Sequence, residues 1–271
     1  MKQELKKTAL SSIMICGILF YITSCININI SNGFPRSLIG NGVMKEKKRS
    51  VTDFDAIDVR GSIDVIISDR NDAPVIVSGD ENLIDSIKTY VDNGTLNIHF
   101  KNGLGYTSKI GLRVTVPNNG HIKNVKASGS SDVTIEGCIT ADNIYVSGKG
   151  SSDIKGNIKA GNCELNFSGS SDYKGMIEAA NCKIRCSGSS DCVISGSADI
   201  CNISMSGSSD FKGYDFVVKK FTCSASGSSD VQVTCTEELY AKANGSSDVY
   251  YKGPAKVMSV QTSGSSDLHH K

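Results

Sequence analysis

Apolar and polar positions alternate along the second half of the chain, and the pattern repeats about every 19 residues. The repeat is easiest to follow from the segment Gly-Ser-Ser-Asp, which occurs eight times. Its aspartates are Asp132, Asp153, Asp172, Asp191, Asp210, Asp230, Asp248 and Asp267. Their residue numbers increase in steps of 21, 19, 19, 19, 20, 18 and 19. A fixed period of this length is typical of a solenoid, in which each repeat stacks on the next.

Three positions of the repeat are almost always apolar. The residue after the aspartate is Val133, Ile154, Tyr173, Cys192, Phe211, Val231, Val249 or Leu268. Seven positions before it stand Val125, Val146, Leu165, Ile184, Ile203, Cys223, Ala241 and Val260. Five positions before it stand Ala127, Gly148, Phe167, Cys186, Met205, Ala225, Ala243 and Thr262. Because the intervening residues are mostly polar, this period of two predicts strands with one buried face.

A single repeat cannot bury its apolar face alone, but a stack of repeats forms a continuous core. We expect each repeat to contain a strand of about five residues, a corner at Gly-Ser-Ser and a second short strand. The prediction is an all-β fold: a single-stranded parallel β-helix with coils of about 19 residues, right-handed by the usual crossover rule. An antiparallel sandwich is the competing fold, but it would not need the same residue type at the same position of every repeat.

Residues 51–120 are rich in predicted strands but lack the repeat. Gly61-Ser62-Ile63-Asp64 resembles a degenerate first copy of the corner. Residues 82–90 are compatible with a short helical turn, and Asn93-Gly94 predicts a hairpin. We therefore expect a wider N-terminal β lobe over 51–120 that continues into the repeat region over 121–271, so that 51–271 form one continuous domain.

The N-terminus has the pattern of a targeting segment. A basic start is followed by a mainly apolar stretch over 8–23 and then by Ile22-Thr23-Ser24-Cys25, which resembles a bacterial lipobox. A plain signal peptide or anchor helix is the alternative, although the apolar stretch is short for a spanning helix. We predict a lipoprotein signal peptide over 1–24 and a lipid on Cys25 that tethers the protein to a membrane. Residues 25–50, which include the basic run 45–49, are expected to form a flexible tether.

Charge and composition argue against several classes of function. The chain has a net charge of +1; loss of residues 1–24 removes three Lys and one Glu, which gives +1 − 3 + 1 = −1. This near-neutral charge gives no electrostatic reason to expect nucleic-acid binding. The four histidines, His99, His121, His269 and His270, lie outside the repeats, and a catalytic serine would not be copied eight times. We therefore expect no enzyme; a polysaccharide-active β-helix would need a charged cluster that the most irregular stretch, 133–140, does not offer.

The aspartates of the repeat form the sharpest candidate site. Each precedes a buried position, so its side chain faces outward, and stacked coils would place the eight carboxylates in a row about 4.8 Å apart. Two like charges at this spacing repel by about 0.9 kcal/mol in water. One interpretation is structural: each carboxylate accepts bonds from serine hydroxyls and backbone N–H groups at its own and the next corner. The other is a cation site, most plausibly for Ca²⁺, which prefers oxygen ligands. We expect no other cofactor.

Eight cysteines follow Cys25. Cys163, Cys182 and Cys201 stand nine positions before their aspartates, so we expect them to stack as buried thiols. Neighbours in register would have Cβ atoms nearly 5 Å apart, which exceeds the usual disulfide range of about 3.5–4.5 Å. Cys186 and Cys192 face inward across one corner and are the best candidates for a disulfide. The histidines do not lie among the cysteines, which argues against zinc.

The strand pattern resembles that of a known family. The residues that carry the resemblance are Phe54-x-x-Ile57-x-Val59-x-Gly61, Val75-x-Val77-x-Gly79-Asp80-x-Asn82-Leu83, Leu96-x-Ile98, Val114-x-Val116-Pro117 and the Gly-Ser-Ser-Asp coils. Over about 51–268 the chain is similar to the auto-transporter adhesin, head GIN domain family, whose members are secreted or lipid-anchored proteins common in Bacteroidetes. The resemblance implies a β-helical fold and an adhesin role, and it supplies no catalytic residues.

Two functions remain open at this stage. The first is a non-enzymatic, lipid-anchored protein of the cell envelope, at the outer membrane on its periplasmic face or the cell surface, that binds glycan or protein surfaces through β-helical faces. The second is an envelope assembly component that stacks through the open strand edge of its incomplete last coil. That edge would be covered by a copy or partner, or blunted by His269, His270 and Lys271.

Overall fold

The computed structural model describes residues 37–102 and 104–271, which form strands and one short 3-10 helix. The N-terminal lobe contains β1 (Ser37–Ile39), β2 (Met44–Arg49), β3 (Ala56–Gly61), β4 (Asp64–Ser68), β5 (Val75–Asp80), η1 (Ile84–Ser86), β6 (Ile87–Asp92), β7 (Thr95–Phe100), β8 (Gly105–Thr107) and β9 (Arg113–Pro117). The repeat region contains β10 (Asn124–Gly129), β11 (Val133–Gly150), β12 (Ile154–Gly169), β13 (Tyr173–Gly188), β14 (Cys192–Gly207), β15 (Phe211–Gly227), β16 (Val231–Gly245), β17 (Val249–Lys252), β18 (Lys256–Gly264) and β19 (Leu268–His270).

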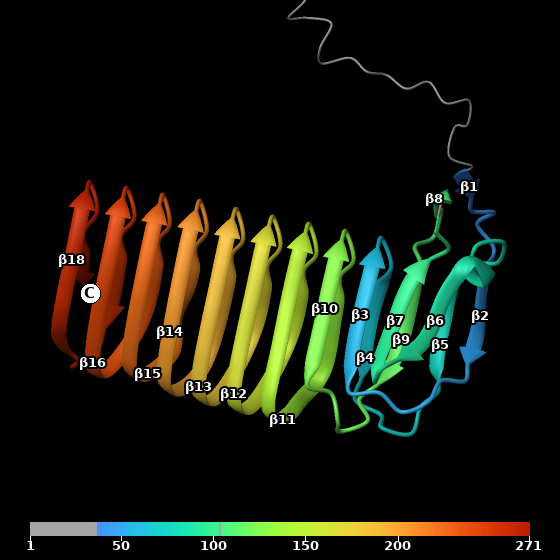
Figure 1. The fold of residues 1–271 in the computed structure, drawn as a ribbon, viewed down its shortest axis with the longest axis horizontal. Coiled ribbons are helices and arrows are strands. Elements are labelled where there is room, and N and C mark those ends of the chain that lie inside the picture. The colour runs from blue at the N-terminus through green and yellow to red at the C-terminus, as the bar shows by residue number, and fades with distance from the viewer. Residues whose placement is uncertain (1–36, 103) are drawn as a thin grey trace, which may run out of the picture. The chain divides into compact units, whose positions relative to one another are not determined.

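The repeats stack as parallel coils along the long axis of the region shown in Figure 1. Val146 lies beside Leu165, and Leu165 lies beside Ile184, so equivalent residues of successive repeats are neighbours. This register confirms the predicted all-β parallel β-helix and its coil length. The coils differ from the prediction in one respect: β11 to β16 are long strands that bend around the core, because pairing with the neighbouring coil continues through most of the bends.

The three apolar positions of the repeat form the core of the inner coils. Tyr173 and Phe211 follow their aspartates and are fully buried, as is Phe167 five positions before Asp172. Phe167 fills the space above Gly148, where a side chain would collide with its ring. The last coil departs from the pattern, because Val260 occupies a core position yet is 44% exposed. Within the described part of the chain, no further coil covers it.

The N-terminal lobe continues the solenoid and then widens. Gly61 at the end of β3 pairs with Gly129, so the degenerate corner does take the place of a first copy. The hairpin at Asn93-Gly94 joins the antiparallel strands β6 and β7, and η1 confirms the helical turn within 82–90. Leu83, Ile84 and Ile87 around η1 are buried in the same hydrophobic core as the coils.

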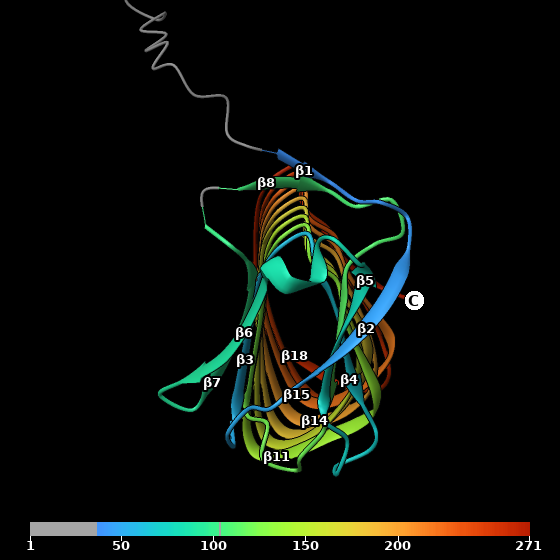
Figure 2. The same cartoon turned by 90° about the vertical axis from the view of Figure 1, so that its right-hand side faces the viewer.

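The tether predicted for 25–50 is wrong for the residues that form β1 and β2. Strand β2 pairs antiparallel with β5 as an edge strand, and it carries the basic residues Lys45, Lys47, Lys48 and Arg49. Lys45 and Lys47 form ion pairs of 2.7 Å with Glu81 and Asp85. In Figure 2 the N-terminal end faces the viewer, and β2 and η1 lie in front of the stacked coils. A run of charge that suits a solvated linker therefore serves here as the outer edge of the sheet. Residues 1–36, with the predicted signal peptide and Cys25, lie outside the described residues.

Candidate functional site

The glycine of each Gly-Ser-Ser-Asp corner is required by close stacking of the backbone. Gly188 has a φ of 85°, in the left-handed region. A Cβ atom at this position would lie 2.6 Å from the carbonyl oxygen of Gly169 in the preceding coil. Ser189 donates its backbone N–H to the same oxygen at 2.7 Å. Only glycine permits this combination of φ and close approach.

The second serine of each corner is buried and bonds neighbouring backbone groups. The hydroxyl oxygen of Ser190 accepts the N–H of Ser171 at 3.3 Å, and that of Ser209 accepts the N–H of Ser190 at 3.2 Å. The Ser190 hydroxyl also donates to the carbonyl of Ser187 at 3.1 Å. A small side chain with both a donor and an acceptor is needed to satisfy these buried groups. At the degenerate copy, the N–H of Ile63 donates to Ser131 while the buried Ile63 side chain ends the serine ladder.

The aspartates form a regular ladder with backbone partners. In each pair of successive copies, Oδ1 of one aspartate accepts the N–H of the next, from Asp132 to Asp267, at 2.8–3.2 Å. Oδ2 of Asp191 also lies 2.9 Å from Nζ of Lys212. These bonds support the interpretation that the aspartates accept backbone N–H groups of the neighbouring corner.

A cation site at the ladder stays a prediction. Burial raises the pKa of Asp172; the N–H of Asp191 acts in the opposite direction, and the carboxylates of Asp153 and Asp191 raise the pKa further. Within residues 37–102 and 104–271, no group of three or more His, Cys, Asp or Glu side chains is arranged to hold a metal ion. Oδ1 of each aspartate from Asp132 to Asp248 is thus occupied by a backbone N–H, and Oδ2 of Asp191 and Asp210 lies close to Nζ of Lys212.

Seven of the eight described cysteines are buried. Cys163, Cys182 and Cys201 are neighbours in register, as the sequence indicates. Burial raises the pKa of the Cys223 thiol to about 12, and it also raises that of Cys192. Such thiols are protonated at neutral pH and pack as small apolar groups. Sγ of Cys186 lies 2.7 Å from Sγ of Cys192, so the two candidates do meet, and their disulfide stays a prediction.

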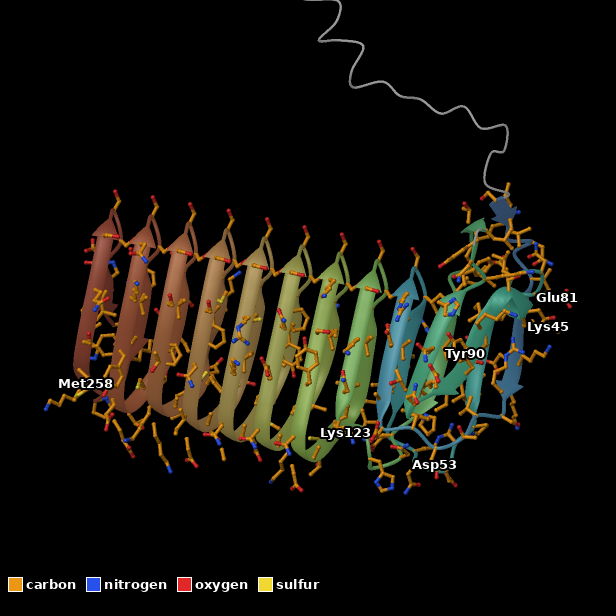
Figure 3. The ribbon with its side chains drawn as sticks, viewed as in Figure 1. Lys45, Asp53, Glu81, Tyr90, Lys123 and Met258 are labelled. Atoms are coloured by element: carbon orange, nitrogen blue, oxygen red, sulfur yellow. The ribbon has the colours of Figure 1, made fainter. Side chains whose placement is uncertain are left out.

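A groove lined by polar and apolar side chains crosses strands β11, β12 and β13, and we call it the axial groove. Its volume is about 450 Å³. It is lined by Lys123, Asn143, Ile144, Tyr145, Asn162, Cys163, Glu164, Asn181, Cys182, Lys183 and Asn202. Lys123 also lines a neighbouring hollow of about 400 Å³ with Asp55 and Gly94. Figure 3 shows Lys123 at the lower edge of the coils, beside the N-terminal lobe.

One wall of the axial groove is a row of amides that we call the asparagine ladder: Asn143, Asn162 and Asn181. These residues are neighbours in register on β11, β12 and β13. Nδ2 of Asn162 donates to Oδ1 of Asn143 at 2.8 Å, and Nδ2 of Asn181 donates to Oδ1 of Asn162 at 2.9 Å. Sequence analysis missed this row, although each member stands ten positions before an aspartate of the repeat. The period could have identified it.

The charged side chains of the groove are paired with one another or with neighbours. Lys123 pairs with Asp55 at 2.5 Å. Glu164 accepts from Arg185 at 2.6 Å and lies 3.4 Å from Lys183. The groove therefore presents amides and one tyrosine ring alongside charged side chains that are engaged in ion pairs, with Lys183 and Arg185 sharing the carboxylate of Glu164.

The protein is a β-solenoid with stacked coils and a filled core. The Gly-Ser-Ser-Asp repeat maintains the stacking of the coils, and the side chains that can contact a ligand lie on the outer faces. Among the described residues, helical structure of the length and apolarity needed to cross a bilayer is absent. A family described as "Putative auto-transporter adhesin, head GIN domain" matches residues 53–255, and the chain belongs to this family. The family is described by adhesion rather than by an enzymatic activity.

Solved structures share the fold. A "putative adhesin" from Parabacteroides merdae is 22% identical, with a TM-score of 0.80, and the match covers 87% of this chain and 99% of that one. A "putative adhesin" from Parabacteroides distasonis is 25% identical, with a TM-score of 0.80 and coverages of 87% and 100%. A "putative lipid binding protein" from the same species is 23% identical, with a TM-score of 0.77 and the same coverages. A comparison with curated proteins gives no match.

Proposed function

We propose that this protein is a non-enzymatic adhesin of the bacterial cell envelope, held at the outer membrane by a lipid on Cys25. The observation that carries the proposal is the axial groove on the outer face of a rigid stack of coils. Membership of the adhesin family supports the same function. A solenoid suits this role because it presents one long surface with little loss of conformational freedom on binding.

The interior of the solenoid favours a surface role over transport of a buried ligand. Phe167, Tyr173, Phe211, Phe216 and Phe221 fill the core and are fully buried. The hollows on the surface are instead open to solvent and are lined by both polar and apolar side chains. Ligands are therefore expected to bind on the outside, through many weak polar contacts.

The anchor and the adhesion are tested separately on the full chain. Cells expressing the wild type should incorporate labelled fatty acid into the protein, and a Cys25→Ser variant should lose the label. Cells that display the wild type should bind immobilised glycans or host matrix more strongly than cells without it. Equal binding by both cell types across glycan, envelope and matrix surfaces would exclude the adhesin function. Labelling of Cys25→Ser would exclude the proposed anchor.

Assembly through the last coil is the second candidate, and the exposed residues of β18 favour it. Met258 and Val260 are each 44% exposed, and Val260 stands at a position that is buried in the preceding coils. An open strand edge with apolar side chains is prone to pair with another edge. The wild type should then form dimers at high concentration, whereas Val260→Lys should remain monomeric in sedimentation velocity. A wild type that stays monomeric throughout would eliminate this candidate.

A further inference from the structure

We propose that the axial groove binds an extended, neutral glycan chain, with the asparagine ladder as its main recognition element. The inference rests on the proposed adhesin function and assigns a ligand class to one site on the outer face. It is carried by the hydrogen-bonding capacity of the ladder, the pairing of the charged side chains around the groove and the position of the groove away from the strand edges.

The asparagine ladder leaves hydrogen-bond donors and acceptors available to a ligand. An asparagine amide carries two N–H donors and a carbonyl oxygen with two lone pairs. Asn162 uses one donor toward Asn143 and one lone pair toward Asn181. One donor and one lone pair therefore remain on an exposed side chain. A pair of adjacent sugar hydroxyls, each of which can donate and accept, complements such an amide.

The bonds between amides also fix their orientation. Each contact joins Nδ2 of one asparagine to Oδ1 of the asparagine in the preceding coil, at 2.8 and 2.9 Å. A chain of this kind holds the side chains in one rotamer before a ligand arrives, so less entropy is lost on binding. At the next coil Ile200 takes the equivalent position, which ends the ladder.

The electrostatics of the groove favour a neutral ligand. Lys123 is paired with Asp55, and Glu164 is contacted by Lys183 and Arg185. A sulfated, phosphorylated or uronic-acid chain would need unpaired cations, and these contacts would have to break to supply them. Amide and hydroxyl groups require no such rearrangement.

The position of the groove favours a glycan over a peptide. Extended peptides are commonly bound by adding a strand to a free sheet edge, where backbone groups supply the affinity. The axial groove instead crosses β11, β12 and β13, whose backbones are paired on both sides. Recognition must therefore come from side chains. Tyr145 lies beside Asn143 at the end near β10, and its partly buried ring, which has Nζ of Lys126 5.8 Å from its centroid, can pack against the C–H face of a sugar.

The length of the groove sets the size of the ligand. Its lining extends over five successive coils, from Lys123 to Asn202. Four coil steps correspond to about 19 Å, at the spacing of parallel strands. Because one coil step is close to the span of a sugar ring, a chain of about four rings would fill the groove.

The test uses isothermal titration of the full chain with neutral tetra- and hexasaccharides of glucose, mannose and xylose, and with polygalacturonate as an anionic probe. Asn162→Ala removes the middle amide of the ladder, and Asn244→Ser is the matched control, because Asn244 lies at a position where most repeats carry serine. We expect at least one neutral oligosaccharide to bind and Asn162→Ala to weaken it about tenfold, with Asn244→Ser unchanged. Asn162→Ala should remain folded with only a small loss in melting temperature, because its two bonds between coils are exposed to solvent.

Three results would overturn the inference: no neutral oligosaccharide binds at millimolar concentration, Asn162→Ala binds as well as the wild type, or polygalacturonate is preferred. Its failure can be distinguished from failure of the adhesin function. If cells displaying the wild type adhere and cells displaying Asn162→Ala adhere equally, the adhesin function stands and the groove is not its site.

Discussion

The two ends of the solenoid differ in how the hydrophobic core is covered. At the N-terminal end, Leu83, Ile84 and Ile87 cover the core, and the charged strand β2 forms an outer edge. At the C-terminal end, the apolar residues Met258 and Val260 are exposed on β18. The core positions of a repeat are thus buried only if another layer follows them. The comparison shows that β2 and the segment around η1 act as a cap, for which β18 has no counterpart among the described residues.

A buried carboxylate holds the N-terminal cap together. Asp80 is fully buried and accepts the N–H of Gly42 at 2.6 Å, the Ser108 hydroxyl at 2.5 Å and the N–H of Lys109 at 3.0 Å. Asn82 adds a bond of 2.8 Å to the carbonyl of Ile39. At the C-terminal coil, fewer contacts cover the end of the solenoid. There His269 stacks on Tyr250 and His270 on Tyr251, with ring centroids 4.8 and 4.5 Å apart.

Asp80→Ala should give the largest loss of stability, because several buried donors of the cap would lose their acceptor. We expect the melting temperature to fall by about 5–10 °C. Asp80→Asn keeps an acceptor and should lose less. Asp199→Ala is the control, since Asp199 is half-exposed and pairs only with Lys219 at 2.7 Å. Equal melting temperatures for Asp80→Ala and Asp199→Ala would contradict a structural role of the buried carboxylate.

The same carboxylate should make the cap sensitive to acid. Burial alone would raise the pKa of Asp80, but the bonds from Ser108, Gly42 and Lys109 outweigh it and lower the pKa below its ordinary value. The ionised form therefore stabilises the fold above the unfolded pKa, and this contribution is lost as the pH falls through the folded pKa. Urea unfolding should show the advantage of the wild type over Asp80→Asn shrinking below about pH 4. A difference that is independent of pH would refute this assignment.

The aspartate ladder offers a comparison of an inner coil with the open end. Oδ1 of Asp191 accepts the N–H of Asp210 at 3.0 Å, whereas Asp267 is the last aspartate of the ladder, with no following coil among the described residues. Asp191→Ala should lower the free energy of unfolding by about 1–2 kcal/mol, and Asp267→Ala by less than about 0.5 kcal/mol. Chemical denaturation of both variants, with and without Ca²⁺, measures this. Equal losses would indicate that the ladder acts through something other than bonds between coils.

The charges of β2 should have the smallest effect on stability and a visible effect on association. Lys45 and Lys47 are about half-exposed, and exposed ion pairs contribute little to stability. Lys45→Thr/Lys47→Thr should therefore melt close to the wild type. It should also associate more readily, because lysines on an edge strand oppose pairing with other edges. Light scattering at increasing concentration tests this; a double variant no more associated than the wild type would mean that the charges do not protect the edge.

Much of the fold could be predicted from the sequence because the residues of the repeat recur at a regular spacing. The regular period and the alternation around Tyr173 and Phe211 required stacked coils with one buried face. Gly61 could be recognised as a first corner because the glycine position is sterically demanding in every copy. The charged run over 45–49 was misinterpreted because charge alone does not distinguish a linker from an edge strand; the pairing of β2 with β5 decides that.

The candidate site was predicted less completely. The aspartates stand out in the sequence, but their carboxylates are largely used within the fold, as the bonds from Asp153 and Asp172 to the preceding copies illustrate. The asparagine ladder is less conspicuous, since only three coils carry an asparagine at that position. Whether two side chains at the same position of successive repeats point into a common groove depends on the bend of each coil.

By itself, the sequence determined the coil length, the buried positions, the glycine corners and the columns in which aspartates and cysteines stack, because each follows from a short period and local sterics. Only the tertiary structure decided how the ends are closed, that Asp80 joins segments distant from it in the sequence, and that the asparagine ladder borders a groove. The closure of the N-terminal end and the contacts of Asp80 join segments that share no period, so no local pattern records them. The groove depends on the bend of each coil, which the period does not fix.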